Sequence, residues 1–311
     1  MKSKSFILGL ILVSLVLAGC DGDSSTNTNP FVGGEQGLAV SYRPLYPPEE
    51  VFDCGDDVFD VEVILNNQGE YDIKQGEAIV TLSGILPSDL GSSSAALEKS
   101  NEEEIKGKYL DENNKQFDGV NTPIEFNDLS YGKCLTANTE LPLWANVCYL
   151  YETKAVAHVC ILQNPRETGG ICEVIGDKTS FVSSGPVQIT EFTENLRGTD
   201  KITFSFTIEK KGSGKVHKES AEDCSKDRNN DNKVFVEIDT GFGGVDCRGL
   251  KDGSATSGYV ELDELGKYVV TCDQTAETTT DFNHPINVKL RYKYSEDIPH
   301  NLKIKHIPGT E

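Results

Sequence analysis

Residues 141–161 of this chain read LPLWANVCYLYETKAVAHVCI, and residues 284–304 read HPINVKLRYKYSEDIPHNLKI. The two segments align without a gap at a shift of 284 − 141 = 143 residues. Apolar and polar residues alternate along both, which is typical of β-strands with one buried face. The alignment also places identical residues on one another: Pro142 on Pro285, and Tyr149-x-Tyr151 on Tyr292-x-Tyr294.

A second pair of segments aligns at the same shift. The segment DVFDVEVILNNQGEYDI begins at Asp57, and DKITFSFTIEKKGSGKV begins at Asp200, which is 200 − 57 = 143 residues later. Gly69 of the first falls on Gly212 of the second. Self-similarity at a fixed shift marks a repeated structural unit, so we infer an internal duplication.

Each unit is expected to contain about seven short strands, which is typical of an immunoglobulin-like sandwich. The last two strands of the first unit are expected to form a hairpin with its turn near Lys154. In that register Tyr149 opposes Val159 on the core face, and Cys148 opposes Cys160 on the other face.

The sequence therefore predicts an all-β protein with two tandem immunoglobulin-like β-sandwich domains, at residues 37–165 and 183–311. A linker is expected at residues 166–182. Residues 87–119 form a polar insertion in the first domain, which we interpret as a solvated excursion or, alternatively, as a partner-binding loop.

The only long apolar run lies at residues 6–23, FILGLILVSLVLAGCDGD. It is shorter than the roughly 20 residues that a membrane span needs, and it matches the core of a signal peptide. Its LAGC ending resembles a lipobox. We predict a lipoprotein signal peptide at 1–19, a lipid on Cys20 and a flexible tether over 20–36. An uncleaved anchor, or an ordinary signal peptide with a chance cysteine, is the alternative.

The 311 residues carry 50 Asp and Glu against 29 Lys and Arg, a net charge of −21. Such an acidic surface repels nucleic-acid phosphates and anionic lipid headgroups, so we expect no nucleic-acid partner. Solubility is the preferred reason for the charge, and high salt or divalent cations are the alternative.

Nine cysteines are present, and lipid on Cys20 would leave 9 − 1 = 8. An even number in an exported chain predicts disulfides. Cys247 and Cys272 are expected to pair inside the second unit, which would stabilise it by roughly 3–4 kcal/mol. The candidates are Cys54, Cys134, Cys148, Cys160, Cys172, Cys224, Cys247 and Cys272.

The remaining pairing is open. Cys160 has two candidate partners, Cys172 just after the first unit and Cys148 across the expected hairpin. The first unit and its exit hold five of the cysteines and the second unit holds three. Because both numbers are odd, either one bond crosses between the units or two thiols stay free. Cys54 and Cys224 lack an obvious local partner, and one of them is expected to form a crossing bond.

Several segments resemble modules of uncharacterised archaeal lipid-anchored surface proteins. They are GLAVSYRPLYPPEEVF, NNQGEYDI, CYLYETKAVAHVCI, SSGPVQITEFTENLRGTDKITFSFTIEKKGSGKV and PINVKLRYKY, within residues 37–305. Proteins of that family are exported and built of immunoglobulin-like sandwiches related to S-layer-associated and CARDB-type adhesion modules. The resemblance implies a fold and a compartment, and it supplies no catalytic residues.

Metal and catalytic motifs are weak. The Asp227-Asn229-Asp231 spacing matches the start of a calcium loop, but Asn232 and Ile238 replace the Gly and Glu that an EF-hand needs, so an acidic loop is preferred. No nucleophile or metal-ligand motif includes any of the five histidines, His158, His217, His284, His300 and His306. We therefore predict no catalytic residues, no metal and no cofactor.

Trp144 and the tyrosines of the final strands are expected in the core, with a sugar-stacking surface as the alternative. The expected function is that of an extracytoplasmic, lipid-anchored structural or adhesive protein, not an enzyme. Its expected partners are the membrane, through the lipid, and an envelope protein or glycan. A ligand-binding envelope lipoprotein is the alternative, and a hydrolase on a sandwich scaffold is a third interpretation.

Overall fold

The computed structural model describes residues 29–308, apart from 56, 165–169, 199–200, 223, 225–226 and 276–277. The predicted signal peptide, Cys20 and the tether up to residue 28 lie outside these residues. The described part is nearly all β-structure, and its helices are two short 3-10 turns, η1 (Pro87–Leu90) and η2 (Arg228–Asn230). None of its helices has the length and apolar character needed to cross a membrane.

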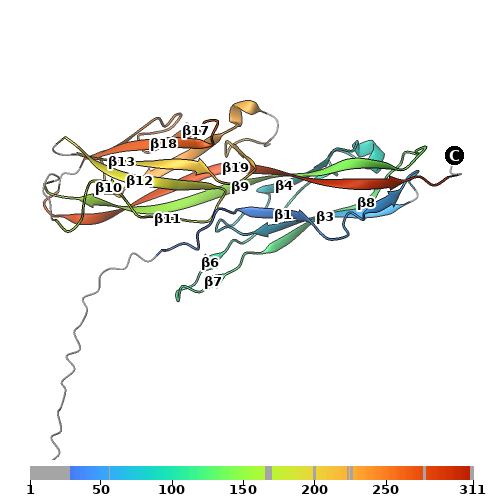
Figure 1. Ribbon diagram of the computed structural model, residues 1–311, viewed down its shortest axis with the longest axis horizontal. Coiled ribbons are helices and arrows are strands. Elements are labelled where there is room, and N and C mark those ends of the chain that lie inside the picture. Colours follow the sequence, from blue (N-terminus) through green and yellow to red (C-terminus); the bar gives the residue numbers. More distant parts are fainter. Residues whose placement is uncertain are drawn as a thin grey trace, which may run out of the picture.

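Two very long strands run through the molecule, β9 (Thr139–Ile161) and β19 (Phe282–Lys305). They pair antiparallel along the whole of β9 and span most of the body's long axis (Figure 1). At about 3.3 Å per residue the ladder is roughly 75 Å long. The expected hairpin is wrong: no turn occurs at Lys154, and Tyr149 opposes Tyr294 instead of Val159. Physically, the segment Glu152–Ala155 contains no Gly, Pro, Asn, Asp or Ser, the residues that dominate turns.

The ladder forms the centre of the largest of three main sheets. The largest has the order β17-β15-β19-β9-β4-β5, with β17 (Ser257–Glu261), β15 (Lys233–Asp239), β4 (Ala78–Ser83) and β5 (Glu98–Ser100). Its long strands also pair with β2 (Glu50–Phe52), β11 (Ser180–Val182) and β14 (Lys215–His217).

A three-stranded sheet contains β1 (Leu38–Tyr42), β3 (Val58–Asn67) and β8 (Asn121–Ser130). A five-stranded sheet contains β10 (Gly176–Asp177), β12 (Val187–Arg197), β13 (Lys201–Lys210), β18 (Lys267–Thr275) and β16 (Val245–Arg248). A separate hairpin pairs β6 (Tyr109–Leu110) with β7 (Gln116–Phe117).

Each of the two smaller sheets packs on a different half of the ladder. In the half with the three-stranded sheet, the Tyr42 hydroxyl of β1 donates to the carbonyls of Leu143 and Ile298, both at 3.3 Å. In the other half, the Glu194 carboxylate of β12 accepts from the Cys160 N–H at 2.9 Å. Each long strand therefore contributes one end to each half, so the two halves share their central strands.

The duplication is visible in the strand positions. The strand β3 covers residues 58–67, and a shift of 143 gives 201–210, the bounds of β13. Four tyrosines, two from each copy, are fully buried at the centre of the ladder; they are Tyr149, Tyr151, Tyr292 and Tyr294. We call them the tyrosine quartet.

The quartet anchors the start of each unit through its hydroxyl groups. Tyr149 accepts from the Leu38 N–H at 3.3 Å, and Tyr292 accepts from the Val187 N–H at 3.2 Å. The other two hydroxyls accept N–H groups of the turns that follow β3 and β13, those of Glu70 (3.1 Å) and Gly214 (2.6 Å). The same bonds in both halves explain why the Tyr-x-Tyr motif recurs.

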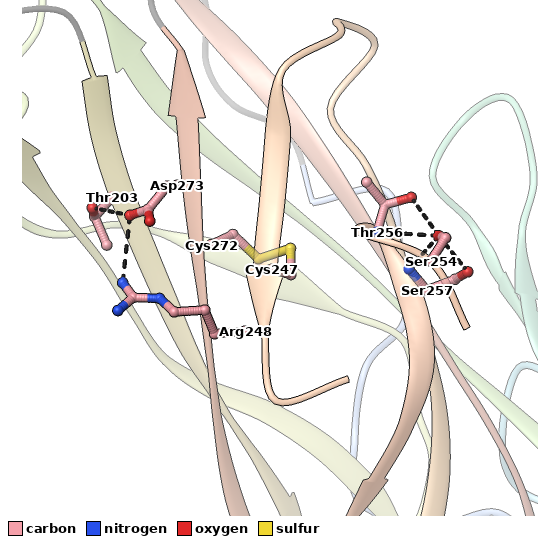
Figure 2. Close-up of a disulfide and its surroundings, with 8 residues drawn as sticks. All are labelled: Thr203, Cys247, Arg248, Ser254, Thr256, Ser257, Cys272 and Asp273. Carbon is pink, nitrogen blue, oxygen red and sulfur yellow. Dashed lines mark hydrogen bonds and ion pairs between the residues drawn. A yellow bond between two sulfur atoms is a disulfide. The ribbon is translucent and has the colours of Figure 1, made fainter. Parts of the chain in front are cut away.

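Four disulfides pair all eight candidate cysteines, as Cys54–Cys134, Cys148–Cys224, Cys160–Cys172 and Cys247–Cys272. The expected bond between Cys247 and Cys272 joins directly opposed residues of β16 and β18 (Figure 2). Beside it, the Asp273 carboxylate accepts from the Thr203 hydroxyl at 2.6 Å.

The pairing resolves both open alternatives. Cys160 bonds Cys172, so the rival bond to Cys148 is wrong. Cys148 instead bonds Cys224, which is the bond that crosses between the two units.

Candidate functional site

A buried histidine lies between a carboxylate and a serine hydroxyl at the junction of the two halves. The Nδ1 atom of His217 is 2.8 Å from Oδ1 of Asp231, and its Nε2 atom is 2.9 Å from Oγ of Ser295. The His217 residue is only 3% exposed. We call these three residues the Asp-His-Ser relay.

Strand register brings the relay together. The short strand β14 pairs with β19 so that Lys215 opposes Ser295 and His217 opposes Lys293. Side chains two residues apart on paired strands are diagonal neighbours on one face, so the imidazole reaches the serine. The third member, Asp231, follows η2 and forms an isolated β-bridge with His217. The intervening residue of β14, Val216, points the opposite way and is fully buried.

Described residues of the loop between β14 and β15 are held next to the relay. Its Cys224 is bonded to Cys148, and Cys148 lies directly opposite Ser295 in the long ladder. The first residue of the loop, Lys218, donates its N–H to the Asn230 carbonyl at 2.8 Å, which closes the base of the loop. The crossing disulfide therefore holds the loop against the sheet next to the serine.

A pocket of about 450 Å³ adjoins the same part of β19. Its wall consists of Val40 of β1, residues 213–215 and residues 295–299, so Ser295 belongs both to the relay and to the pocket lining. Glu296 in this wall is half-buried, and burial raises the pKa of its carboxyl group. Burial also raises the pKa of Tyr294 to about 12, so its hydroxyl stays protonated at neutral pH.

The repeat explains why this pocket is open. In the other half, β11 pairs with residues 155–157 of β9. The corresponding residues of β19 are 298–300, and no strand of the described chain pairs with their outer edge. Pro299 there corresponds to Val156 and lacks the N–H group that a neighbouring strand would need.

A second exposed feature is the β6–β7 hairpin within the predicted insertion at 87–119. It projects from the body of the molecule (Figure 1). The rings of Tyr109 and Phe117 stack with centroids 4.9 Å apart and are 53% and 36% exposed. The turn is well ordered by Asp111, whose carboxylate accepts the N–H groups of Asn113 and Lys115 at 2.9 and 2.8 Å.

The sequence-predicted residues have varied outcomes. Asp227 and Asp231 of the possible calcium loop direct their carboxylates to protein groups, the Asn229 N–H and the His217 ring. Within the described residues, no group of three or more His, Cys, Asp or Glu side chains could hold a metal ion. The tyrosines lie in the core as expected, whereas Trp144 is 36% exposed and is not a core residue.

Sequence reasoning missed the relay entirely. His217 is 295 − 217 = 78 residues from Ser295, and no motif joins the two positions. Alternation along β14 indicates only that His217 points away from Val216, which for a two-sheet protein suggests a solvent-facing side chain. The bond that holds Cys224 beside this face could not be assigned from the sequence.

No protein-family model matches the chain, and no curated protein matches it. Among solved structures, a serine-rich repeat adhesion glycoprotein from Streptococcus agalactiae aligns with 89% of this chain and 99% of its own. The identity is 10% and the TM-score is 0.18. A TM-score this low does not demonstrate a shared fold, so the match says nothing about what the present chain binds.

Proposed function

We propose that this protein is a lipid-anchored spacer of the cell envelope, built of two interlocked immunoglobulin-like units and related to the archaeal surface modules that it resembles. The observation that carries the proposal is the continuous β9–β19 ladder. Tandem domains joined by a linker move relative to one another by default, because their interface is small. Because both halves share the two long strands, there is no linker about which one half could move relative to the other. A spacer needs this stiffness.

The covalent bonds support the same role. The crossing disulfide between Cys148 and Cys224 ties the halves together a second time. Four disulfides in one chain are typical of proteins in an oxidising compartment, as expected outside the cytoplasm. The proposed lipid on Cys20 would fix one end of the spacer to the membrane.

Contact with a partner is assigned to the β6–β7 hairpin. Exposed aromatic rings with polar neighbours are the residues that most often anchor protein and sugar ligands. The hydrogen-bonded turn at Asp111 holds the hairpin closed and keeps Tyr109 and Phe117 stacked on one another. The partner is an envelope protein or an envelope glycan.

Small-angle scattering of the lipid-free chain tests the spacer. A single rigid rod at least about 75 Å long is expected, and a profile that requires two units moving independently would contradict it.

Mass spectrometry of the membrane-bound protein tests the anchor: lipid is expected on Cys20, and Cys20→Ser is expected to release the protein into the medium. Recovery of an unmodified Cys20 in the membrane fraction would refute the anchor.

The hairpin is tested with isolated envelopes. The double variant Tyr109→Ala, Phe117→Ala is expected to lose binding, whereas Leu265→Ala, at a leucine that is 80% exposed elsewhere, should bind like the wild type. Loss after protease treatment of the envelopes identifies a protein partner, and loss after periodate treatment identifies a glycan. Equal binding by the double variant and the wild type would exclude the hairpin.

A further inference from the structure

We propose that Ser295 is a nucleophilic serine with His217 as its general base, and that it accepts the acyl group of a small uncharged ester bound in the adjacent pocket. Asp231 acts on His217 as a positioning residue. This activity goes beyond the spacer role and does not depend on it, because neither the ladder nor the lipid anchor uses the relay.

The order of the atoms in the relay is the one that this chemistry requires. An ionised carboxylate only accepts hydrogen bonds, so the Nδ1 atom of His217 facing Asp231 carries the ring proton. The lone pair of Nε2 is then directed at the Ser295 hydroxyl, 2.9 Å away. A nucleophile, a base and an orienting carboxylate that follow one another in space in this order are the arrangement that activates a serine, whichever fold carries them.

Comparison with the other repeat argues against a purely structural relay. A shift of 143 places His217 on Lys74 and Ser295 on Glu152. Lys74 instead forms an ion pair with Glu104, and Glu152 forms ion pairs with Lys154 and Arg291. The first unit therefore builds the corresponding long strands and buried tyrosines without a relay, so the fold itself does not require one.

The pocket provides a place for the substrate. Its volume of about 450 Å³ falls in the usual range for small-molecule sites. Alternation along β19 places Asp297 and Pro299 on the same face as Ser295, and Glu296 and Ile298 on the opposite face, so the lining reaches both faces at the uncovered edge of the strand. Its charged side chains are those of Lys215, Glu296 and Asp297. Two carboxyl groups against one ammonium group, on a chain of net charge −21, disfavour anionic substrates, so we assign an uncharged ester.

The reaction has two balanced steps. In the first, Ser295 Oγ bonds to the ester carbonyl carbon and its proton passes to His217 Nε2. The bond from that carbon to the leaving oxygen breaks, and the alcohol departs with the proton from Nε2. In the second, water attacks the acyl group and gives its proton to Nε2. The carboxylic acid leaves, and Ser295 Oγ recovers the proton.

Covalent labelling of the folded, oxidised full chain with a fluorophosphonate probe tests the proposal. Peptide mass spectrometry is expected to find the adduct on Ser295, and Ser295→Ala is expected to remove it. His217→Gln is expected to slow labelling by about 100-fold or more, because a general base contributes 10²–10⁴. The matched control is Ser254, an exposed serine whose hydroxyl bonds Ser257 and Thr256, and Ser254→Ala should label like the wild type.

The pH profile separates a base from a merely structural histidine. The wild-type labelling rate should rise with pH as one group loses a proton and then level off. Asp231→Asn should slow labelling and move that rise to lower pH, because the charged imidazole loses its carboxylate partner. Thermal unfolding of each variant checks that it is folded. An unlabelled Ser295, or labelling unchanged by His217→Gln in a folded variant, would overturn the proposal. Hydrolysis of p-nitrophenyl acetate that survives in Ser295→Ala would also overturn it.

Discussion

Leu150 of β9 pairs directly with Lys293 of β19, and the two residues occupy the same position in the two repeats, since 293 − 150 = 143. Corresponding positions oppose one another where a two-fold axis relates the copies, as in a symmetric dimer. The tyrosine quartet lies around this point: Tyr149 opposes Tyr294, and Tyr151 opposes Tyr292. The chain is thus arranged like a dimer with exchanged strand ends whose two subunits became one polypeptide.

Gly69→Ala is expected to destabilise the protein by about 1–3 kcal/mol, which is the usual cost of overpacking a core. A Cβ at this position would overlap the Tyr151 hydroxyl, just as one at Gly212 would overlap the Tyr294 hydroxyl. This shared contact explains why glycine recurs at the 143-residue shift. Denaturant unfolding measures the change in the free energy of unfolding.

The matched control for this substitution is Gly243→Ala. A Cβ at Gly243 would meet nothing within 4 Å, so its free energy of unfolding should change by less than about 0.5 kcal/mol. Equal effects of the two substitutions would show that the tyrosine contact is not the cause.

Removing the crossing disulfide should cost more than removing either of two others. In the loop-entropy model, the 76-residue separation of Cys148 and Cys224 gives about 4.5 kcal/mol, and the 25-residue separation of Cys247 and Cys272 gives about 3.5 kcal/mol. Double Cys→Ser variants, unfolded in urea without reductant, should therefore lose free energy of unfolding in that order, with the largest loss at Cys148 and Cys224. The double variant at Cys160 and Cys172, 12 residues apart, should lose least, and the reverse ranking would refute this account.

Strand positions were largely predictable from alternation, whereas the pairing of the long strands was not. The sequence around Asp57 and Asp200 predicted the strands now seen as β3 and β13. A 23-residue strand is far longer than the usual 3–10 residues, so a hairpin was the reasonable expectation for the segment around Lys154. The missing turn residues there were the available sign that the strand continues.

The relay depends on that exchange of strand ends and was therefore beyond sequence reasoning. Ser295 lies near the middle of β19, where β14 pairs with one edge of the strand and β9 with the other. The disulfides were more predictable, because the odd number of cysteines in each unit required a crossing bond if every thiol was paired. Which cysteine of the first unit made that bond followed only from the register that places Cys148 near the loop of Cys224.

Pro299→Val is expected to make the protein self-associate. The substitution restores an N–H group on an edge of β19 that no strand of the described chain covers. An unprotected strand edge pairs with other chains, and proline is one of the devices that prevents this. Sedimentation over a range of concentrations should show more dimer or larger species than the wild type. An unchanged distribution would mean that Pro299 does not protect the edge.

Glu194 provides the last prediction, a dependence of stability on pH. This carboxylate is fully buried between the Cys160 N–H and the Lys178 ammonium, which is 3.0 Å away. Burial raises its pKa from 4.5 to about 7, despite the opposing hydrogen bonds. Between these two values the folded state holds a proton that the unfolded state has lost.

The free energy of unfolding should therefore fall as pH rises from about 4.5 to about 7, by up to about 3 kcal/mol from this group. Glu194→Gln stays neutral and should remove this part of the slope, so its stability relative to the wild type should increase across the same window. Glu50→Gln is the control: the hydrogen bond from Lys303 lowers the pKa of Glu50, so any contribution of this carboxylate to stability is lost only as pH falls below about 4.5, outside this window. Unfolding curves at several pH values measure both slopes. A constant difference between Glu194→Gln and the wild type would show that Glu194 is ionised throughout the window, with Lys178 compensating its burial.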